Sequence, residues 1–287
     1  MKVNEKFRTV VQDWLIPRVP YSYARRLCRS VKRLSSPGML ATLTKNGNLR
    51  NAYAGKRCFV IGNGPSLNRQ DLSVLLKEVT IACNCFYRGA PKNWHPTIYC
   101  AADPASSELK AKHYESVFKE LNASAYVFEF TALRRLHSLH HEIPSLEKVL
   151  GQLYGVVFDD PLFMLSGPVE VDMTRPIPGV GHTPMLSLMV ALYLGCNPII
   201  LIGADHDYEY KYFRGDYKVS HFYCEKEEEV EIMPLLPRAV IAKEVFKTYS
   251  SYEMLNKIAR KMGVEIYDAT DGGHLDVFPN VEYASLF

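Results

Sequence analysis

A glycine turn after a short apolar run is the strongest candidate for chemistry in this sequence. Residues 57–61 predict a buried strand, and they are followed directly by Gly62, Asn63, Gly64, Pro65 and Ser66. Such a turn can present a ligand at the carboxyl end of the first strand of an α/β sheet, where free backbone N–H groups bind phosphate oxygens. Leu67 occupies the place of the third glycine in a dinucleotide fingerprint. The turn therefore predicts a nucleotide-type ligand in general terms, with a tight turn that binds nothing as the alternative.

Polar residues at the ends of predicted strands form a second group of candidates. Four apolar runs end this way, at Asn63, Asn84, Asp103 and Asp205. The carboxyl ends of parallel strands meet at one edge of a sheet, where ligands bind. One such residue is routine, but four together favour a polar ligand.

Three further positions could take part in catalysis or binding. His182 and Thr183 open an apolar helical run, and the start of a helix can hold a phosphate or a carboxylate. Simple helix capping is the more common role for such residues. Asp205, His206 and Asp207 could bind a metal ion, or an acid among them could orient a substrate hydroxyl. His221 lies in a polar, irregular segment and could act as a general base near neutral pH.

The elements that must position these residues alternate between strands and helices. Strands are predicted at 57–61, 79–83, 97–101, 125–128, 198–202 and 265–267, and the main helices at 106–121, 183–194 and 239–262. This pattern predicts a Rossmann-like, doubly wound α/β domain with a mostly parallel sheet over residues 55–287. Residues 209–237 are polar and irregular, which predicts a lid-like insertion.

Composition limits the classes of protein that this chain can belong to. The 287 residues are 47% hydrophobic and 23% charged, as is usual for a globular protein with a sizeable core. The seven cysteines are odd in number and include no C-x-x-C pair, so we expect neither a disulfide framework nor a zinc site. Together with the lack of a secretory signal pattern at the start, this predicts a cytoplasmic protein.

Residues 1–54 predict a helical, basic extension. Residues 14–70 contain eleven Lys and Arg and no Asp or Glu, so the rest of the chain carries a net charge of 3 − 11 = −8. We expect an anionic membrane surface to contact residues 14–57, at the inner face of the plasma membrane, and no nucleic acid partner. A solvated basic helix packed on the body is the alternative.

Several of these motifs resemble those of a known group of transferases. Residues 60–67, 83–87 and 194–205 resemble motifs of bacterial sialyltransferases that use CMP-sialic acid. The span 55–287 also resembles the MptE-like family, which includes a 6-hydroxymethylpterin diphosphokinase and bacterial proteins encoded near polysaccharide genes. Residues 266–270 and 277–279 are typical of those bacterial members. Residues 1–54 are not covered by either resemblance.

The sialyltransferase resemblance implies a role for each matching residue. Asn63, Gly64 and Ser66 would contact the nucleotide, Asn84 the cytidine or sugar, and Thr183, preceded by His182, would lie near the donor. Asp103 stands where that family has a donor-binding asparagine. Tyr208 and Tyr212 would stabilise the leaving phosphate, and His221 would deprotonate the acceptor hydroxyl in an inverting transfer without a metal or other cofactor.

Two alternatives remain open. A diphosphokinase would bind ATP at the same glycine turn, with Asp103, Asp205 and Asp207 as magnesium ligands. A non-catalytic protein that binds a nucleotide sugar is the other alternative. The basic, aromatic extension favours a glycosyltransferase of bacterial surface-glycan synthesis, with a CMP-sugar donor and a glycan or glycolipid acceptor.

Overall fold

The computed structural model describes residues 38–102, 108–216, 218, 221–224 and 237–287. The chain divides into two compact units, Met1–Ala41 and Thr42–Phe287. Of the predicted features, most of the basic extension, Asp103 and the acidic stretch of the lid-like insertion lie outside the described residues.

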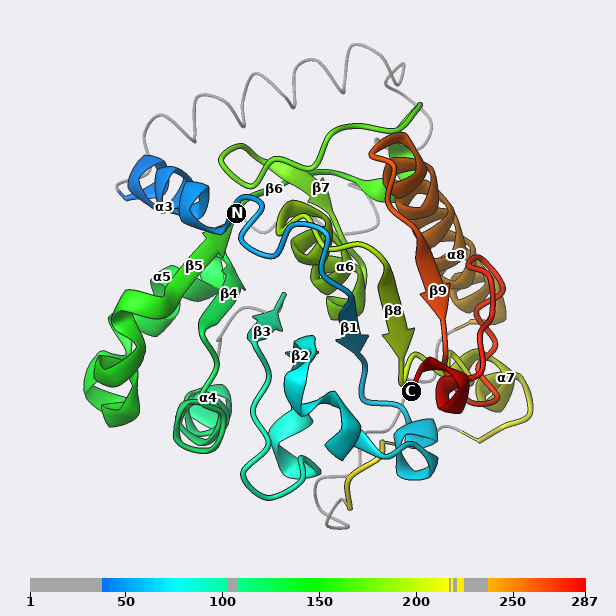
Figure 1. Ribbon diagram of the computed structural model, residues 1–287, viewed down its shortest axis with the longest axis horizontal. Coiled ribbons are helices and arrows are strands. Elements are labelled where there is room, and N and C mark those ends of the chain that lie inside the picture. The colour runs from blue at the N-terminus through cyan, green and yellow to red at the C-terminus, as the bar shows by residue number, and fades with distance from the viewer. Residues whose placement is uncertain (1–37, 103–107, 217, 219–220, 225–236) are drawn as a thin grey trace. The chain divides into compact units, whose positions relative to one another are not determined.

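A seven-stranded, wholly parallel sheet is the centre of the second unit (Figure 1). The strand order is β5-β4-β3-β2-β1-β8-β9. The bounds are β1 Cys58–Ile61, β2 Val79–Cys83, β3 Ile98–Ala101, β4 Ala125–Glu129, β5 Leu153–Val156, β8 Ile199–Ile202 and β9 Ile266–Asp268. Residues of β1, β2, β3 and β8 are all buried, which explains why these strands appear as continuous apolar runs rather than alternating ones. The predicted Rossmann-like α/β fold is confirmed.

Helices cover both faces of the sheet. Cys58 and Val60 of β1 face one core, which they share with α6 (Thr183–Tyr193) and α8 (Arg238–Lys261). Phe59 and Ile61 face the other, with α4 (Glu108–Glu120) and α5 (Phe130–Ser138). Because successive strand residues point to opposite faces, β1 contributes side chains to both cores. The predicted buried helix after residue 182 is α6, in which every residue except Pro184 is buried.

Short elements complete the described chain. The helices are α3 Met39–Lys45 and α7 Tyr208–Phe213, and a second, two-stranded sheet pairs β6 Phe158–Pro161 with β7 Ile177–Gly179. The 3-10 turns are η2 Asn46–Leu49, η3 Pro65–Arg69, η4 Leu72–Lys77, η5 Phe86–Arg88, η6 His140–Glu142, η7 Pro144–Gln152, η8 Leu162–Met164 and η10 Tyr283–Leu286. No helix in these described ranges is both long and apolar enough to cross a membrane.

The second unit begins before the predicted boundary at 54/55. The side-chain amide of Asn46 is fully buried and donates to Gly155 O and Met173 O, each at 2.7 Å. Further along, Asn51 N donates to Tyr193 O and Gly55 N donates to Gly195 O. Residues 46–55 therefore tie the amino edge of the sheet to β5 and to the end of α6.

The strand order places a topological switch point between β1 and β8. From β1 the chain adds β2 to β5 on one side, and later adds β8 and β9 on the other. The connections on the two sides diverge there, and in such sheets ligands bind outside the carboxyl ends of the strands at this point. The glycine turn and Asp205 follow these two strands, so both lie at the switch point.

Candidate functional site

The glycine turn after β1 packs directly on the turn after β8. Gly64 N donates to Gly203 O at 2.9 Å, and Gly62 N donates to Ile202 O at 2.8 Å. A Cβ atom on Gly62 would lie 2.1 Å from Gly203 O, and one on Gly64 would lie 1.7 Å from Asp205 Oδ2. Both glycines are therefore required by close packing between the two turns.

Asp205 holds the residue that follows the glycine turn. Its Oδ1 accepts from Ser66 N at 3.0 Å, and its Oδ2 accepts from Ser66 Oγ at 2.7 Å. Both residues are buried. Burial raises the pKa of Asp205 and the neighbouring Asp207 carboxylate adds to the rise, while the Ser66 hydrogen bonds oppose it. The N–H groups of residues 62, 64 and 66 thus already have protein acceptors, so this turn differs from an open phosphate cradle.

Two asparagines follow the adjacent strands β1 and β2. Asn63 Nδ2 donates to Cys83 O at 3.0 Å, and Asn84 takes a left-handed conformation with φ 50°. Asparagine tolerates that conformation better than most residues. The buried Asn63 Oδ1 accepts no hydrogen bond from any described residue. Asn63 Oδ1 is thus a buried acceptor without a described donor, next to the switch point.

The segment carrying His221 lies against the glycine turn. Phe222 N donates to Asn63 O at 3.1 Å, and the Phe222 ring stacks on Phe86 with a centroid distance of 5.4 Å. The His221 ring stacks on Tyr223 at 4.8 Å. The residue that directly follows His221 therefore contacts the glycine turn, where the donor nucleotide is predicted to bind.

The two predicted leaving-group tyrosines lie on α7. Tyr208 begins this helix, directly after the Asp205 segment, and its side chain is outside the described set. Tyr212 is buried, with its ring packed edge-on to Phe213. Their roles remain predictions.

Two histidines lie close together next to α6 and α8. His182 is the N-cap of α6, and its Nε2 lies 3.1 Å from Thr248 Oγ1. His206 is buried, has φ 48°, and places its Nε2 at 3.1 Å from Tyr252 Oη. The two rings are 6.0 Å apart. Burial, with a smaller effect from His182, lowers the pKa of His206 to about 3, so this ring is neutral under physiological conditions.

Sequence reasoning considered His206 only as a possible metal ligand and did not select Asp268 as a site residue. The placement of His206 between two acids after a strand was the available signal, but it suggested only a metal site. Asp268 ends β9, is 2% exposed and accepts from Thr270 N at 2.9 Å. Burial raises the pKa of Asp268 to about 6, and Asp205 contributes to the rise.

Asp205 and Asp207, the two proposed metal ligands that the structure describes, bond to other residues. Asp207 Oδ2 pairs with Lys211 Nζ at 2.7 Å, and Asp205 bonds to Ser66. Within the described part of the chain, no three His, Cys, Asp or Glu side chains form a group that could hold a metal ion. Asp103 lies outside that part.

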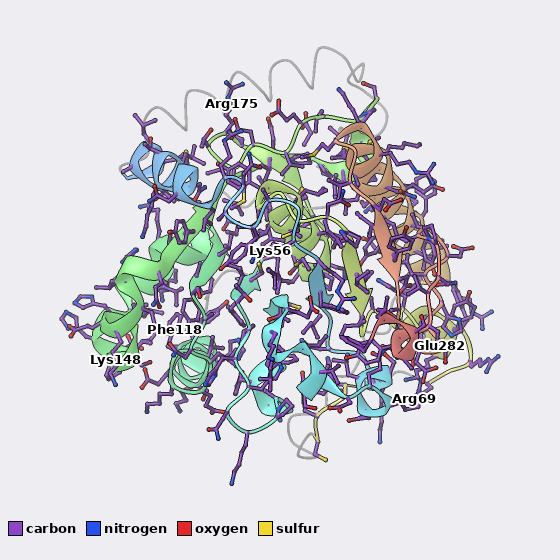
Figure 2. The ribbon with its side chains drawn as sticks, in the orientation of Figure 1. Lys56, Arg69, Phe118, Lys148, Arg175 and Glu282 are labelled. Carbon is purple, nitrogen blue, oxygen red and sulfur yellow. The ribbon has the colours of Figure 1, made fainter. Side chains whose placement is uncertain are left out.

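The loop after β9 is fixed to the segment after the glycine turn. Arg69 of η3, labelled in Figure 2, forms an ion pair with the Asp271 carboxylate and also donates to Asp271 O at 2.6 Å. Thr270 Oγ1 accepts from Ala204 N at 3.2 Å. The ends of β1, β8 and β9 are thus linked through side chains at one edge of the sheet.

Comparison with known proteins found one similar fold. No protein-family model matches this chain, and no curated protein sequence matches it. A solved structure described as the MAf glycosyltransferase from Magnetospirillum magneticum AMB-1 is similar over 86% of this chain, with a TM-score of 0.45 and 12% sequence identity. The match covers 39% of that longer chain.

Proposed function

We propose that this chain is an inverting glycosyltransferase of bacterial surface-glycan synthesis, which takes a CMP-activated acidic sugar as donor and a glycan or glycolipid as acceptor. The observation that carries the proposal is the position of His221. Its segment is bonded to Asn63, at the switch point where the strand order predicts a ligand. A candidate base thereby lies beside the turn whose sequence resembles the donor motif of sialyltransferases.

The chemistry is a displacement at the anomeric carbon. His221 accepts the proton of an acceptor hydroxyl, and the hydroxyl oxygen forms a bond to the anomeric carbon. The bond from that carbon to the phosphate oxygen breaks, and CMP leaves with the electron pair. Tyr208 and Tyr212 are proposed to donate hydrogen bonds to the departing phosphate, in place of a metal ion.

The internal contacts of the acids support a reaction without a metal. Asp205 bonds to Ser66 through both carboxylate oxygens, and Asp207 pairs with Lys211. Magnesium coordination would have to replace or share these contacts. The cytoplasm, with peripheral contact at the inner face of the plasma membrane, is the proposed place of action.

A magnesium-dependent diphosphokinase that acts on 6-hydroxymethyl-dihydropterin is the second candidate. Burial raises the pKa of Asp205, and the negative charge of Asp207, two positions away, adds to that rise. A divalent cation would relieve that repulsion and could bridge them to ATP phosphates, with Asp103 as a third ligand.

Calorimetric titration distinguishes the proposed glycosyltransferase from the diphosphokinase. The full chain is titrated with CMP and with ATP, each in magnesium and in chelator. Metal-independent CMP binding without ATP binding is expected. Magnesium-dependent ATP binding without CMP binding would replace the proposal with the diphosphokinase.

The variant His221→Ala tests whether this chain is an enzyme or a non-catalytic binding protein. We expect CMP affinity within about twofold of wild type and a fall of about 10²–10⁴ in the turnover of a CMP-sugar that wild type uses. The variant Lys218→Ala, in the same segment, is the matched control and should retain turnover. Near-normal turnover by His221→Ala would remove this residue from the mechanism.

A further inference from the structure

A partly buried thiol follows β2 at the same edge of the sheet as the glycine turn. Strands β1 and β2 are parallel neighbours, and Cys85 comes directly after Asn84, beyond the carboxyl end of β2. Hydrogen bonds fix the backbone of both residues. Tyr99 Oη donates to Asn84 O at 2.9 Å, and Arg88 N donates to Cys85 O at 3.0 Å. Cys85 therefore has a defined position, one residue from a predicted donor contact.

A histidine of α4 lies against this thiol. His113 places its Nδ1 3.8 Å from Cys85 Sγ, which is within reach of a hydrogen bond that involves sulfur. Two tyrosine rings pack against the imidazole, with centroid distances of 5.5 Å for Tyr87 and 4.9 Å for Tyr114. Tyr114 is itself buried, so it gives the imidazole a fixed support. The His113 ring is thereby held where it can accept the proton of the Cys85 thiol.

The other described cysteines differ from Cys85 in their access to solvent. Four of them are buried, namely Cys58, Cys83, Cys100 and Cys196. Burial raises the pKa of Cys100 to about 12, and it also raises the pKa of Cys83. Cys224 is exposed and serves as a reference for a solvated thiol. Since the thiolate is the nucleophile and a histidine beside a thiol favours it, the pair of Cys85 and His113 combines partial access with activation.

We infer that Cys85 and His113 form a modification site, at which hydrogen peroxide and other small hydroperoxides oxidise the thiol. His113 Nδ1 takes the thiol proton, and the sulfur attacks one oxygen of the peroxide. The S–O bond forms as the O–O bond breaks. The leaving hydroxide carries away the electron pair and takes the proton from His113, which gives water. The sulfur is oxidised by two electrons to a sulfenic acid, and the peroxide is reduced.

The position of Cys85 suits an oxidant of this class. A small, uncharged molecule can reach a partly buried sulfur without the desolvation cost that a charged reagent would have. The reaction needs no donor and no acceptor, so it is independent of the proposed glycosyl transfer. Only one consequence rests on that proposal: a nucleotide bound at the glycine turn and Asn84 would cover the neighbouring thiol.

The test compares the oxidation rates of individual cysteines in the full chain. The protein is treated with hydrogen peroxide at pH 7 together with dimedone, which traps sulfenic acids, and mass spectrometry follows each cysteine-containing peptide. Cys85 should be trapped at least about tenfold faster than Cys224, although Cys224 is more exposed. An equal or lower rate at Cys85 would overturn the inference, and this comparison needs no variant.

The variant His113→Gln tests the role of the imidazole. It should slow the trapping of Cys85 at least about tenfold and leave Cys224 unchanged. His141→Gln is the matched control, since His141 is an exposed histidine of η6, and it should behave as wild type. Equal rates in wild type and His113→Gln would overturn the inference.

The pH profile separates activation from packing. Between about pH 6 and about pH 8, trapping of Cys85 should rise less steeply with pH in wild type than in His113→Gln, because an unassisted thiol with a pKa near about 8.5 follows its thiolate fraction. Parallel profiles would show that His113 only packs against the thiol. Trapping of the buried Cys58 and Cys100 would reveal an unfolded variant, and the comparison within wild type then decides.

Addition of CMP links this site to the proposed function. Saturating CMP should slow the trapping of Cys85 and leave that of Cys224 unchanged. If Cys85 is trapped fast and CMP does not slow it, the modification site stands and the proposed position of the donor is wrong.

Discussion

Gly62 and Gly64 mark the closest approach between the segments that follow β1 and β8. We predict that Gly64→Ala lowers the free energy of unfolding by about 1–3 kcal/mol, because a Cβ atom would lie 1.7 Å from Asp205 Oδ2 and force that carboxylate away from Ser66. Gly62→Ala should cost at least as much, since the atom it meets is a backbone oxygen. Urea denaturation measures both.

Gly151→Ala is the control for these two substitutions, because a Cβ atom there meets nothing within 4 Å. It should leave the midpoint of unfolding within experimental error of wild type. Unchanged stability in Gly64→Ala would show that the turn relaxes and that Asp205 does not fix it.

Asp268 gives the protein a pH-dependent stability of predictable sign. Burial raises the pKa of Asp268 to about 6, so the native state keeps this proton while the unfolded state, with a carboxyl pKa near about 3.9, loses it. The contribution of Asp268 to the free energy of unfolding is therefore largest at low pH. It is lost as the pH rises from about 4 to about 6, and the loss is about 3 kcal/mol at most.

Asp268→Asn should remove this contribution and keep the acceptor for Thr270 N. The difference in unfolding free energy, variant minus wild type, should increase between about pH 4 and about pH 6.5 and then level off. Denaturation series at several pH values measure it. A pH-independent difference would show that Asp268 is ionised in the folded protein throughout this range.

The packing of Phe222 holds the His221 segment on the sheet edge. Phe222 is buried against Phe86 and Gly89, and its backbone bonds to Asn63. Phe222→Ala should release the segment, because the buried ring that packs on Phe86 is lost. We expect cleavage by trypsin after Lys218 to accelerate at least about tenfold, measured by mass spectrometry of native digests.

Phe213→Ala is the matched control, since Phe213 is 45% exposed at the end of α7. Its cleavage rate should stay near that of wild type. Once a donor is known, Phe222→Ala should lower kcat more than it raises the KM for donor, as expected for a disordered base. Equal cleavage rates in both variants would show that Phe222 does not hold the segment.

The basic extension and the α/β unit can be tested separately with shortened chains. A chain that starts at Gly38 keeps α3 and all residues of the second unit, whereas one that starts at Gly55 loses Asn46 and Leu49, both buried. The first should fold and bind nucleotide as the full chain does. The second should be destabilised, because two buried hydrogen bonds and a core side chain are absent.

The same pair of chains tests the membrane prediction. Six Arg and Lys residues between positions 18 and 33 are absent from the chain that starts at Gly38. Co-sedimentation with anionic vesicles should therefore be strong for the full chain and weak for the shortened one, and both should ignore neutral vesicles. Equal sedimentation of the two chains would contradict the prediction.

Most strands and the main helices of the α/β unit, with their parallel connections, could be predicted from the residues alone. α7 is an exception, because it lies in the stretch 209–237 that was predicted to be irregular. Apolar runs such as 198–202 are too short for helices and are bounded by polar turn residues, so buried strands were the expected outcome. Because helices lie between most of these strands, parallel connections were expected. β5 and the β6–β7 pair were less predictable, because the prolines between residues 144 and 180 interrupt the pattern.

Which polar residues bond to one another, by contrast, follows from the three-dimensional fold. Asp205 could have been a metal ligand or a substrate contact, and the fold shows it bonded to Ser66, 139 positions earlier in the chain. The neutral state of His206 and the raised pKa of Asp268 depend on burial, which arises from elements that no local pattern connects. Local sequence sets backbone preference and hydrophobic period, whereas hydrogen-bond partners and desolvation are set by long-range packing.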